Sequence, residues 1–169
     1  VGVSAGIRAW AMSNDVDVAF ISRRGTYLGQ LLPASSSTRV HRIRDQFAFA
    51  DDPVRSMQLI RAIVDAKVRK QIVVLQRFGR RAHADLTRDA VGELRNLLVM
   101  IPDSNTTDEA MGLEGAAAHV YFPCFGALLP PGLQFEVRSR QPPMDVANSA
   151  LSYLYTILTS ECTSALVAA

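Results

Sequence analysis

The chain has 169 residues, of which 49% are hydrophobic, so it can bury the core of one compact domain or of two small lobes, and global disorder is excluded. Its 18 basic and 16 acidic residues give a net charge of +2, which is too small to indicate a nucleic-acid partner by itself. The charge is unevenly spread, because residues 39–81 carry a net charge of +7 and the rest of the chain carries −5.

The two cysteines, Cys124 and Cys162, lie far apart and form no C-x-x-C pair, which argues against a disulfide framework and against a thiolate zinc site. This cysteine usage favours a reducing cytoplasm. No apolar run approaches the roughly 18–20 residues that span a bilayer, and no signal-peptide pattern opens the chain. We therefore expect a soluble, cytoplasmic protein without membrane contacts.

The first residues of the chain carry its main signals for β-structure. A short helix is expected over residues 4–12 with Ser4 as its N-cap. The apolar runs at residues 16–21 and 26–31 flank a turn at residues 23–25, which predicts a β-hairpin. An isolated hairpin is marginal in water, so further strands are expected upstream of this sequence. Residues 33–38, PASSST, have the composition of a flexible connector.

The rest of the chain is predicted to be helical. Asp52 before Pro53 is an N-cap and first-turn pair, and apolar residues then recur at helical spacing as far as Phe78. Further helices are expected over residues 88–100 and 107–128, and from Asp145 to the end. The predicted fold class is α+β: the remnant of a small N-terminal β-lobe with a helix and a β-hairpin (residues 1–33), a linker (34–42) and a mainly α-helical lobe (43–169) that is incomplete at its C-terminus.

The segment MGLEGAAAHVYF, residues 111–122, places an acidic residue on the apolar side of its own helix. Glu114 shares this side with Met111, Ala117 and Tyr121. An ionised carboxylate there needs a compensating partner, and the small residues at 115–118 would let another helix, a metal ion or a backbone phosphate come close. A buried Glu–Arg pair is the simpler interpretation, and a metal-ligand or acid/base role is the alternative.

The three histidines do not extend this pattern. His119 points elsewhere on the same helix, and His41 and His83 lie in arginine-rich segments without H-x-x-x-H or H-E-x-x-H spacing. The one G-x-S-x-G match, GVSAG at residues 2–6, has its serine as the expected N-cap of a helix, and the sequence lacks a glycine-rich phosphate loop. Hydrolase triads and P-loop nucleotide chemistry are therefore unsupported.

The long helix after Pro53 carries a basic stripe opposite its apolar residues. Its members are Arg55, Arg69, Arg77 and Arg80, with Lys70 at the edge. Such a stripe can displace counterions from a nucleic-acid backbone, although a solvated helix face explains it equally well. Lys67 differs, because it lies at the rim of the apolar stripe, where a snorkelling amine or a buried ion pair is expected, and a pair with Glu114 is one such arrangement.

Residues 135–148, FEVRSRQPPMDVAN, combine basic residues with a double proline. Arg138 and Arg140 share one side of this segment if it is extended, and Asp145 can cap the final helix. A polar stripe follows in that helix, formed by Asn148, Ser152, Tyr155 and Thr159. An internal hydrogen-bonding seam or the lining of a wet cleft would explain this stripe.

Two blocks of the sequence, GxEGxAAxxYF at residues 112–122 and RSRQPPMDxxNxxLSYxYxxL at residues 138–158, together resemble the CRISPR adaptation integrase, the nuclease family that inserts new spacers into CRISPR arrays. Their order and spacing make the resemblance specific. Residues 1–31 are similar to the end of that family's N-terminal β-lobe. IVDAKVRKQ at residues 63–71 is similar to its I-V-x-x-K-I-x-N-Q helix.

The resemblance implies an enzyme in which a 3′-hydroxyl of a short DNA fragment attacks a phosphodiester at a repeat boundary, with Mg²⁺ or Mn²⁺ held by a Glu, a His and an Asp. It implies double-stranded DNA, homodimers and a small dimeric companion protein of ferredoxin-like fold as partners, in a prokaryotic cytoplasm. Glu114 matches the family's Glu ligand and is the expected catalytic and metal-binding residue. The residues expected to contact DNA are Arg55, Arg69, Lys70, Arg77, Arg138 and Arg140.

The family's His and Asp ligands lie in G-F-L-H and D-L-M-E segments that follow the last helix, and neither occurs in these 169 residues. One carboxylate cannot hold a hard, octahedral cation against water. We therefore expect this polypeptide alone to be inactive, as part of a longer protein that extends beyond both ends. Lys70, His119 and Gln141 also replace residues that are frequent in the family.

Two hypotheses from other functional classes stay open. A non-catalytic DNA-binding or scaffolding module would use the basic region at residues 39–81 and would bind duplex DNA with a steep salt dependence. A helical protein-interaction module would instead use exposed apolar surface.

Overall fold

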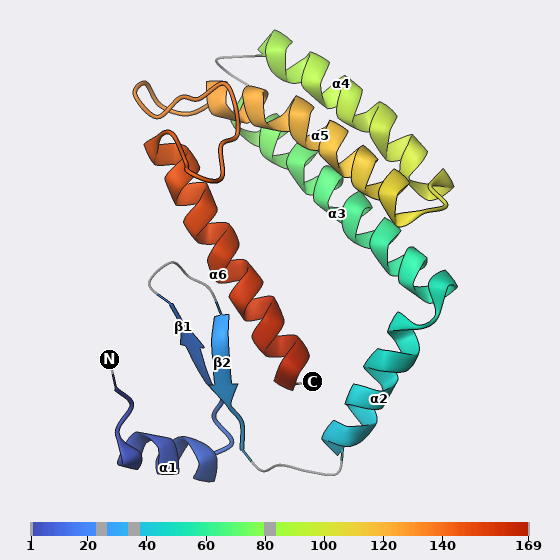
Figure 1. Ribbon diagram of the computed structural model, residues 1–169. Helices are drawn as coiled ribbons and strands as arrows, with labels where there is room; N and C mark the ends of the chain where they lie inside the picture. The colour runs from blue at the N-terminus through green and yellow to red at the C-terminus, as the bar shows by residue number, and fades with distance from the viewer. Residues whose placement is uncertain (1, 23–26, 34–37, 80–83, 169) are drawn as a thin grey trace. The chain divides into compact units, whose positions relative to one another are not determined.

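The computed structural model describes residues 2–22, 27–33, 38–79 and 84–168. By their contacts the residues divide into two units, one formed by residues 1–48 with 150–169 and the other by residues 49–149. Helices dominate, with one small antiparallel sheet of two strands among the described residues (Figure 1). The predicted α+β class is therefore confirmed, whereas the lobe boundaries at residues 33 and 42 stay a prediction.

The first unit begins with helix α1 (Ala5–Ser13). Ser4 is its N-cap, as predicted, because the hydroxyl oxygen of Ser4 accepts a hydrogen bond from the backbone N–H of Ile7 at 3.2 Å. Asn14 ends the helix, and the next residue, Asp15, has a positive φ of 52°. A short polar residue tolerates this left-handed conformation, which turns the chain toward the sheet.

Strands β1 (Val18–Ile21) and β2 (Tyr27–Leu31) form the predicted antiparallel hairpin, each slightly shorter than expected. The turn predicted at residues 23–25 lies outside the described residues. Ile21 pairs with Tyr27 and Phe20 pairs with Gly29, so Leu28 is an extra residue in the ladder. Gly29 has a φ of 147°, a conformation that glycine adopts readily, and it permits this irregularity.

Helix α2 (Thr38–Ala50) is absent from the sequence-based prediction. Its large apolar residues, Val40, Ile43 and Phe47, do follow helical spacing, but the helix has no acidic residue in its first turn and is rich in arginine. All three apolar side chains are exposed. The helix therefore lacks the broad apolar stripe of a buried helix. Its composition resembles that of a polar connector.

The second unit is built on helix α3 (Pro53–Gly79). Asp52 caps it as predicted, since its Oδ1 accepts hydrogen bonds from the backbone N–H groups of Val54 and Arg55, both at 3.0 Å. Helix α4 (Ala84–Met100) begins four residues before the predicted start at 88 and is followed by a short 3₁₀ helix, η1 (Ile101–Asp103). Helix α5 (Thr107–Ala127) agrees closely with the prediction.

Helices α3, α4 and α5 lie side by side in one bundle (Figure 1). The residues at its centre are buried and apolar: Val68, Leu75, Leu94, Ile101, Ala110 and Ala117. Gly79 at the end of α3 meets Thr87 near the start of α4 so closely that a Cβ on Gly79 would lie 2.0 Å from the Thr87 hydroxyl. Arg61 on α3 donates to the backbone oxygen of Ser104, which follows η1. The bundle fixes α5 against α3.

Helix α6 (Val146–Ala168) starts after Asp145, whose Oδ1 accepts the backbone N–H of Asn148 at 2.7 Å, so the predicted cap is confirmed. The hydroxyls of Thr156 and Thr159 donate to backbone oxygens four residues earlier in the same helix. These two hydroxyls are thus satisfied within α6, and the predicted seam along Asn148, Ser152, Tyr155 and Thr159 stays a prediction. No helix in the described ranges is both long and apolar enough to cross a membrane.

Candidate functional site around Glu114

Glu114 lies at the edge of the buried face of α5 rather than at its centre. Its side chain is 19% exposed. Ala117 and Tyr121, which share its side of the helix, are buried, whereas Met111 on the same side is 55% exposed. Ala110, one helical turn before Glu114, is also buried, so the buried face continues along α5 on both sides of Glu114, and the carboxylate lies at the edge of this face, next to exposed Met111.

The partner of Glu114 is Lys67 on α3, whose ammonium Nζ donates to Oε1 of Glu114. This confirms the pairing that the sequence left open, and it differs from the simpler interpretation, in which an arginine balances the carboxylate in the interior. The Lys67 side chain is 34% exposed. Since both charges keep some contact with water, the pair ranks between a surface ion pair and a buried one in its effect on stability.

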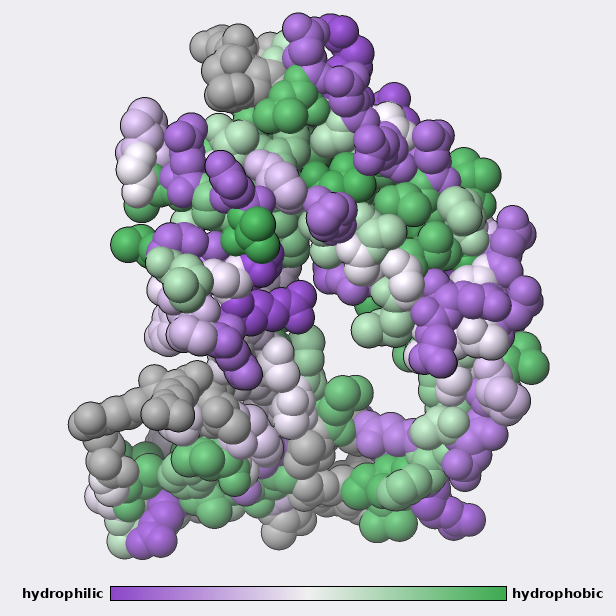
Figure 2. All heavy atoms as spheres, turned by 45° about the horizontal axis from the view of Figure 1, so that its top comes forward, coloured by the Kyte–Doolittle hydropathy of each residue, from purple (hydrophilic) through white to green (hydrophobic). Residues whose placement is uncertain are grey.

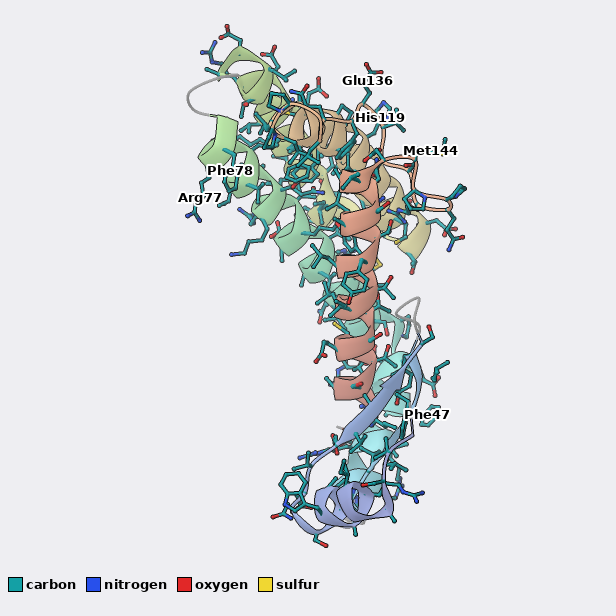
Figure 3. All side chains as sticks on the ribbon, turned by 90° about the vertical axis from the view of Figure 1, so that its left-hand side faces the viewer. Phe47, Arg77, Phe78, His119, Glu136 and Met144 are labelled. Atoms are coloured by element: carbon teal, nitrogen blue, oxygen red, sulfur yellow. The ribbon has the colours of Figure 1, made fainter. Side chains whose placement is uncertain are left out.

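A hollow of about 280 Å³ lies along the neighbouring side of α5, and Glu114 is not one of its lining residues. Ala118, one helical turn after Glu114, lines it, and so do other residues of α5 and of the segment after it: Gly115, His119, Phe122, Glu136, Val137, Arg138 and Arg140. Figure 3 shows His119 and Glu136 near each other at this end of the bundle. The small residues Gly115 and Ala118 leave the room that the sequence predicted.

The segment that closes the hollow is held by Asn148, whose side chain is fully buried. Oδ1 of Asn148 accepts hydrogen bonds from Nη1 of Arg138 at 2.9 Å and from the backbone N–H of Ser139 at 3.1 Å. Its Nδ2 donates to the backbone oxygen of Val137 at 3.0 Å and to Oδ2 of Asp145 at 2.6 Å. The half-buried Arg138 thus helps to position residues 137–139.

Arg140, next along the same segment, is exposed at the hollow. His119 is exposed on α5, which agrees with the surface or partly packed position expected from the sequence, and His41 is also exposed. The sequence analysis singled out neither Glu136 nor the hollow itself. Glu136 lies in an irregular segment, where no periodic pattern indicates which way a side chain points.

The predicted basic stripe is exposed on α3, with Arg55, Arg69, Lys70 and Arg77 all in contact with solvent. Arg80 lies outside the described residues. Nε and Nη2 of Arg69 donate to the carboxylate of Asp65 at 2.6 and 2.9 Å, and this ion pair raises the pKa of Arg69. Arg69, one of these four basic residues, is therefore already paired with a carboxylate on the same helix.

Two of the other arginines make cation–π contacts with aromatic rings. The guanidinium of Arg55 lies 4.8 Å from the ring centre of Phe49, and that of Arg77 lies 5.8 Å from the ring centre of Phe78. Figure 3 shows Arg77 directed away from the bundle, and Figure 2 shows hydrophilic and hydrophobic side chains interspersed on the face in view. These arginines remain available to a partner in solution.

A carboxylate oxygen is a ligand type that divalent metal ions accept, but in the structure the carboxylate of Glu114 is paired with the Lys67 ammonium. Within the described part of the chain, however, no three His, Cys, Asp or Glu side chains come close enough together to hold a metal ion. The described residues therefore do not form a metal site by themselves.

A family model described as CRISPR associated protein Cas1 matches residues 1–169, so the chain belongs to the Cas1 family. The resemblance seen in the sequence blocks around Glu114 and Asn148 is confirmed.

Several curated proteins are similar to the chain. It is 34% identical over 154 residues to a CRISPR-associated endonuclease Cas1 of Thermus thermophilus, which covers 91% of this chain and 44% of that protein. It is 29% identical over 149 residues to the CRISPR-associated endonuclease Cas1 of Mycobacterium tuberculosis, covering 87% and 42%. The chain thus spans less than half the length of these two relatives.

Solved structures share the fold. A partial Cas6-RT-Cas1–Cas2 complex contains a chain with a TM-score of 0.72 and 25% identity, and the match covers 99% of this chain and 51% of that one. A casposase bound to integration product has a TM-score of 0.67 and 23% identity, covering 99% and 49%. The second match supports the fold alone, and the first agrees with the family assignment.

Proposed function

We propose that this chain is part of a Cas1 integrase and endonuclease that joins short DNA fragments to a CRISPR array by transesterification with Mg²⁺ or Mn²⁺. The observation that carries the proposal is the half-buried carboxylate of Glu114, which is paired with Lys67 and lies one helical turn before Ala118, a lining residue of the hollow with basic residues. Family membership and the endonuclease names of the curated relatives support it.

In this proposal Glu114 is one ligand of the metal ion, and a His and an Asp outside the described residues complete the set. A bound divalent ion would stabilise the charge that develops on the phosphate oxygens during the reaction. Arg140, exposed at the hollow, would orient a DNA phosphate, and Arg138 would hold the segment in place through Asn148. Without the other ligands, the 169-residue polypeptide would not catalyse the reaction.

The exposed cations of α3 would bind the backbone of double-stranded DNA. Arg55, Arg69, Lys70 and Arg77 present their charges to solvent and not to the bundle core. The protein would act as a homodimer together with a Cas2-like companion, which the Cas1–Cas2 composition of the similar complexes supports. These partners are proposed for the whole protein.

The test of the catalytic role is Glu114→Gln in the full-length protein that carries this sequence. DNA integration and cleavage with Mn²⁺ should fall by more than about 100-fold, because even outer-shell partners of a metal contribute 10- to 100-fold. Glu93→Gln is the matched control, since Glu93 is an exposed glutamate on α4. Unchanged activity of Glu114→Gln would refute the proposal.

The exposed arginines favour a second candidate, a non-catalytic DNA-binding or scaffolding module. That function predicts duplex-DNA binding with steep salt dependence that Glu114→Gln does not alter. Replacing both Arg69 and Arg77 by Gln should then weaken binding and reduce the slope of log affinity against log salt by about 1 for each lost phosphate contact. Arg88→Gln on α4 is the control.

A further inference from the structure

Two oxygen acceptors lie near Lys67 in sequence or in space. One is the carboxylate of Glu114, which accepts its ammonium in the structure. The other is the side-chain amide of Gln71, one helical turn further along α3. Gln71 is only 7% exposed, yet its Oε1 has no hydrogen-bond partner among the described residues.

A buried amide oxygen without a partner is uncommon in folded proteins and calls for an explanation. Gln71 follows Lys67 by four residues, which on an α-helix places the two side chains about 40° apart around the axis. Their Cβ atoms are then about 5–6 Å apart, and the long, flexible lysine side chain spans such a distance easily. Oε1 of Gln71 is therefore within reach of the Lys67 ammonium.

Charge repulsion at the Lys67–Glu114 pair explains when Oε1 of Gln71 would accept the ammonium. An ammonium and a divalent cation on the same carboxylate repel each other, so a cation that binds Glu114 displaces Lys67. The displaced ammonium retains three donors, and its side chain is 34% exposed, so it needs a new acceptor near its old position. A neutral amide oxygen offers a hydrogen bond without competing for the cation.

We propose that Lys67 is a positioning residue with two acceptors: it pairs with Glu114 when that carboxylate is free, and it moves to Oε1 of Gln71 when a divalent cation takes Glu114. The orphan oxygen of Gln71 is the acceptor for the second state. The role of the cation rests on the proposed function of Glu114, whereas the exchange of Lys67 between the two acceptors does not.

The exchange itself is tested on the chain without metal, by urea unfolding of Gln71→Met in two backgrounds. In the wild-type background, Gln71→Met should leave the unfolding equilibrium constant unchanged or lower it, because it removes an orphan polar atom and keeps the volume. In the Glu114→Ala background, where Lys67 has to use Gln71, the same change should raise that constant about 2- to 10-fold. Adding Lys67→Met should abolish the difference.

An equal effect of Gln71→Met in both backgrounds would overturn the proposal. A difference that persists with Lys67→Met would overturn it as well, because the second acceptor would then serve some other donor. If Gln71→Met does not fold, Gln71→Leu serves in the same cycle.

The link to the metal ion is tested in the full-length protein by Mn²⁺ titration followed by electron paramagnetic resonance. Lys67→Met should raise the affinity for Mn²⁺, and Gln71→Met should lower it about 2- to 10-fold, because the displaced ammonium loses its second acceptor. A merely structural role of either residue predicts neither change. Glu114→Ala should abolish binding at this site.

The outcomes separate this inference from the proposed function. If Glu114→Ala abolishes Mn²⁺ binding while Gln71→Met leaves it unchanged, the two-acceptor role is wrong and the proposed function stands. If Glu114→Ala leaves Mn²⁺ binding unchanged, the proposed function fails, and the urea experiment alone decides whether Lys67 exchanges between the two acceptors.

Discussion

The ammonium of Lys67, in the middle of α3, donates to the carboxylate of Glu114, which lies 47 residues later on α5. This ion pair joins the two helices at the edge of their apolar contact, where α5 passes from buried Ala117 to exposed Met111. It keeps an acidic side chain in a half-buried position with a lysine as its partner. The carboxylate that we propose as a metal ligand is therefore held in place by a side chain of the neighbouring helix.

Replacement of Arg61 by Met should destabilise the bundle. Nε of Arg61 donates to the backbone oxygen of Ser104 at 2.8 Å, and Nη2 donates to the same atom. Since Ser104 is buried, the loss of this charged donor should lower the free energy of unfolding by about 1–3 kcal/mol in urea titrations. Arg95→Met, at an exposed position on α4, should change it by less than about 0.5 kcal/mol. Equal effects would contradict this role of Arg61.

Two glycines of the bundle should respond in opposite directions to alanine. A Cβ on Gly79 would lie 2.0 Å from the hydroxyl and 2.7 Å from other atoms of Thr87, so Gly79→Ala should cost about 1–3 kcal/mol of stability. A Cβ on Gly92, inside α4, would meet nothing within 4 Å, so Gly92→Ala should stabilise by about 0.5–1 kcal/mol through helix propensity. Thermal melts measure both, and a stabilising Gly79→Ala would contradict the close approach of α3 and α4.

Stability should depend on the Asp145 carboxylate at acid pH. The Asn148 side chain, and then its backbone N–H, donate to this carboxylate and hold the pKa of Asp145 below its usual range. A lowered folded-state pKa gives stability that is present above the unfolded value, about 3.9, and is lost as the pH falls through the folded value.

Asp145→Asn should therefore destabilise the chain at pH 6, and its deficit relative to wild type should shrink as the pH falls below about 4. Urea titrations at a series of pH values measure this deficit. Asp108→Asn, an exposed aspartate in the first turn of α5, is the comparison variant. A deficit that does not change with pH would show that the charge of Asp145 contributes nothing.

The two cysteines should differ in reactivity. Cys124 is 3% exposed, and burial raises the pKa of its thiol, whereas Cys162 is exposed. A thiol reagent at pH 8 should modify Cys124 in the Cys162→Ser variant at least about 100-fold more slowly than Cys162 in the Cys124→Ser variant, because reaction requires a thiolate and an opening of the bundle. The rates should converge in denaturant. Similar rates in the native protein would mean that α5 opens readily.

Local signals predicted most of the secondary structure. Ser4, Asp52 and Asp145 are N-caps as expected, because capping depends on a side chain and backbone groups only two or three residues away. Helix α2 escaped prediction, since its few large apolar residues are exposed and its composition is that of a connector. The start of α4 was placed too late, because its first turn, ADLT, contains a single large apolar residue and gives little helical periodicity.

Of the candidate site, the sequence predicted Glu114 but not the contacts around it. The spacing of small and apolar residues around Glu114 marked a carboxylate that needs a partner, and the blocks around it identified the family. That Lys67 supplies the partner, that Arg138 is engaged by Asn148, and that Gln71 has an orphan oxygen are properties of contacts between separate segments.

By itself the sequence predicted helices α1, α3, α4, α5 and α6, three of their N-caps, and Glu114 as the carboxylate that needs a partner, since helical periodicity and capping involve neighbours within one or two turns. Only the tertiary structure decided which charges meet. The packing of α3 against α5 brings Lys67 and Glu114 together, although their separation along the chain follows no pattern, and it leaves Glu114 half-buried with a lysine as its partner.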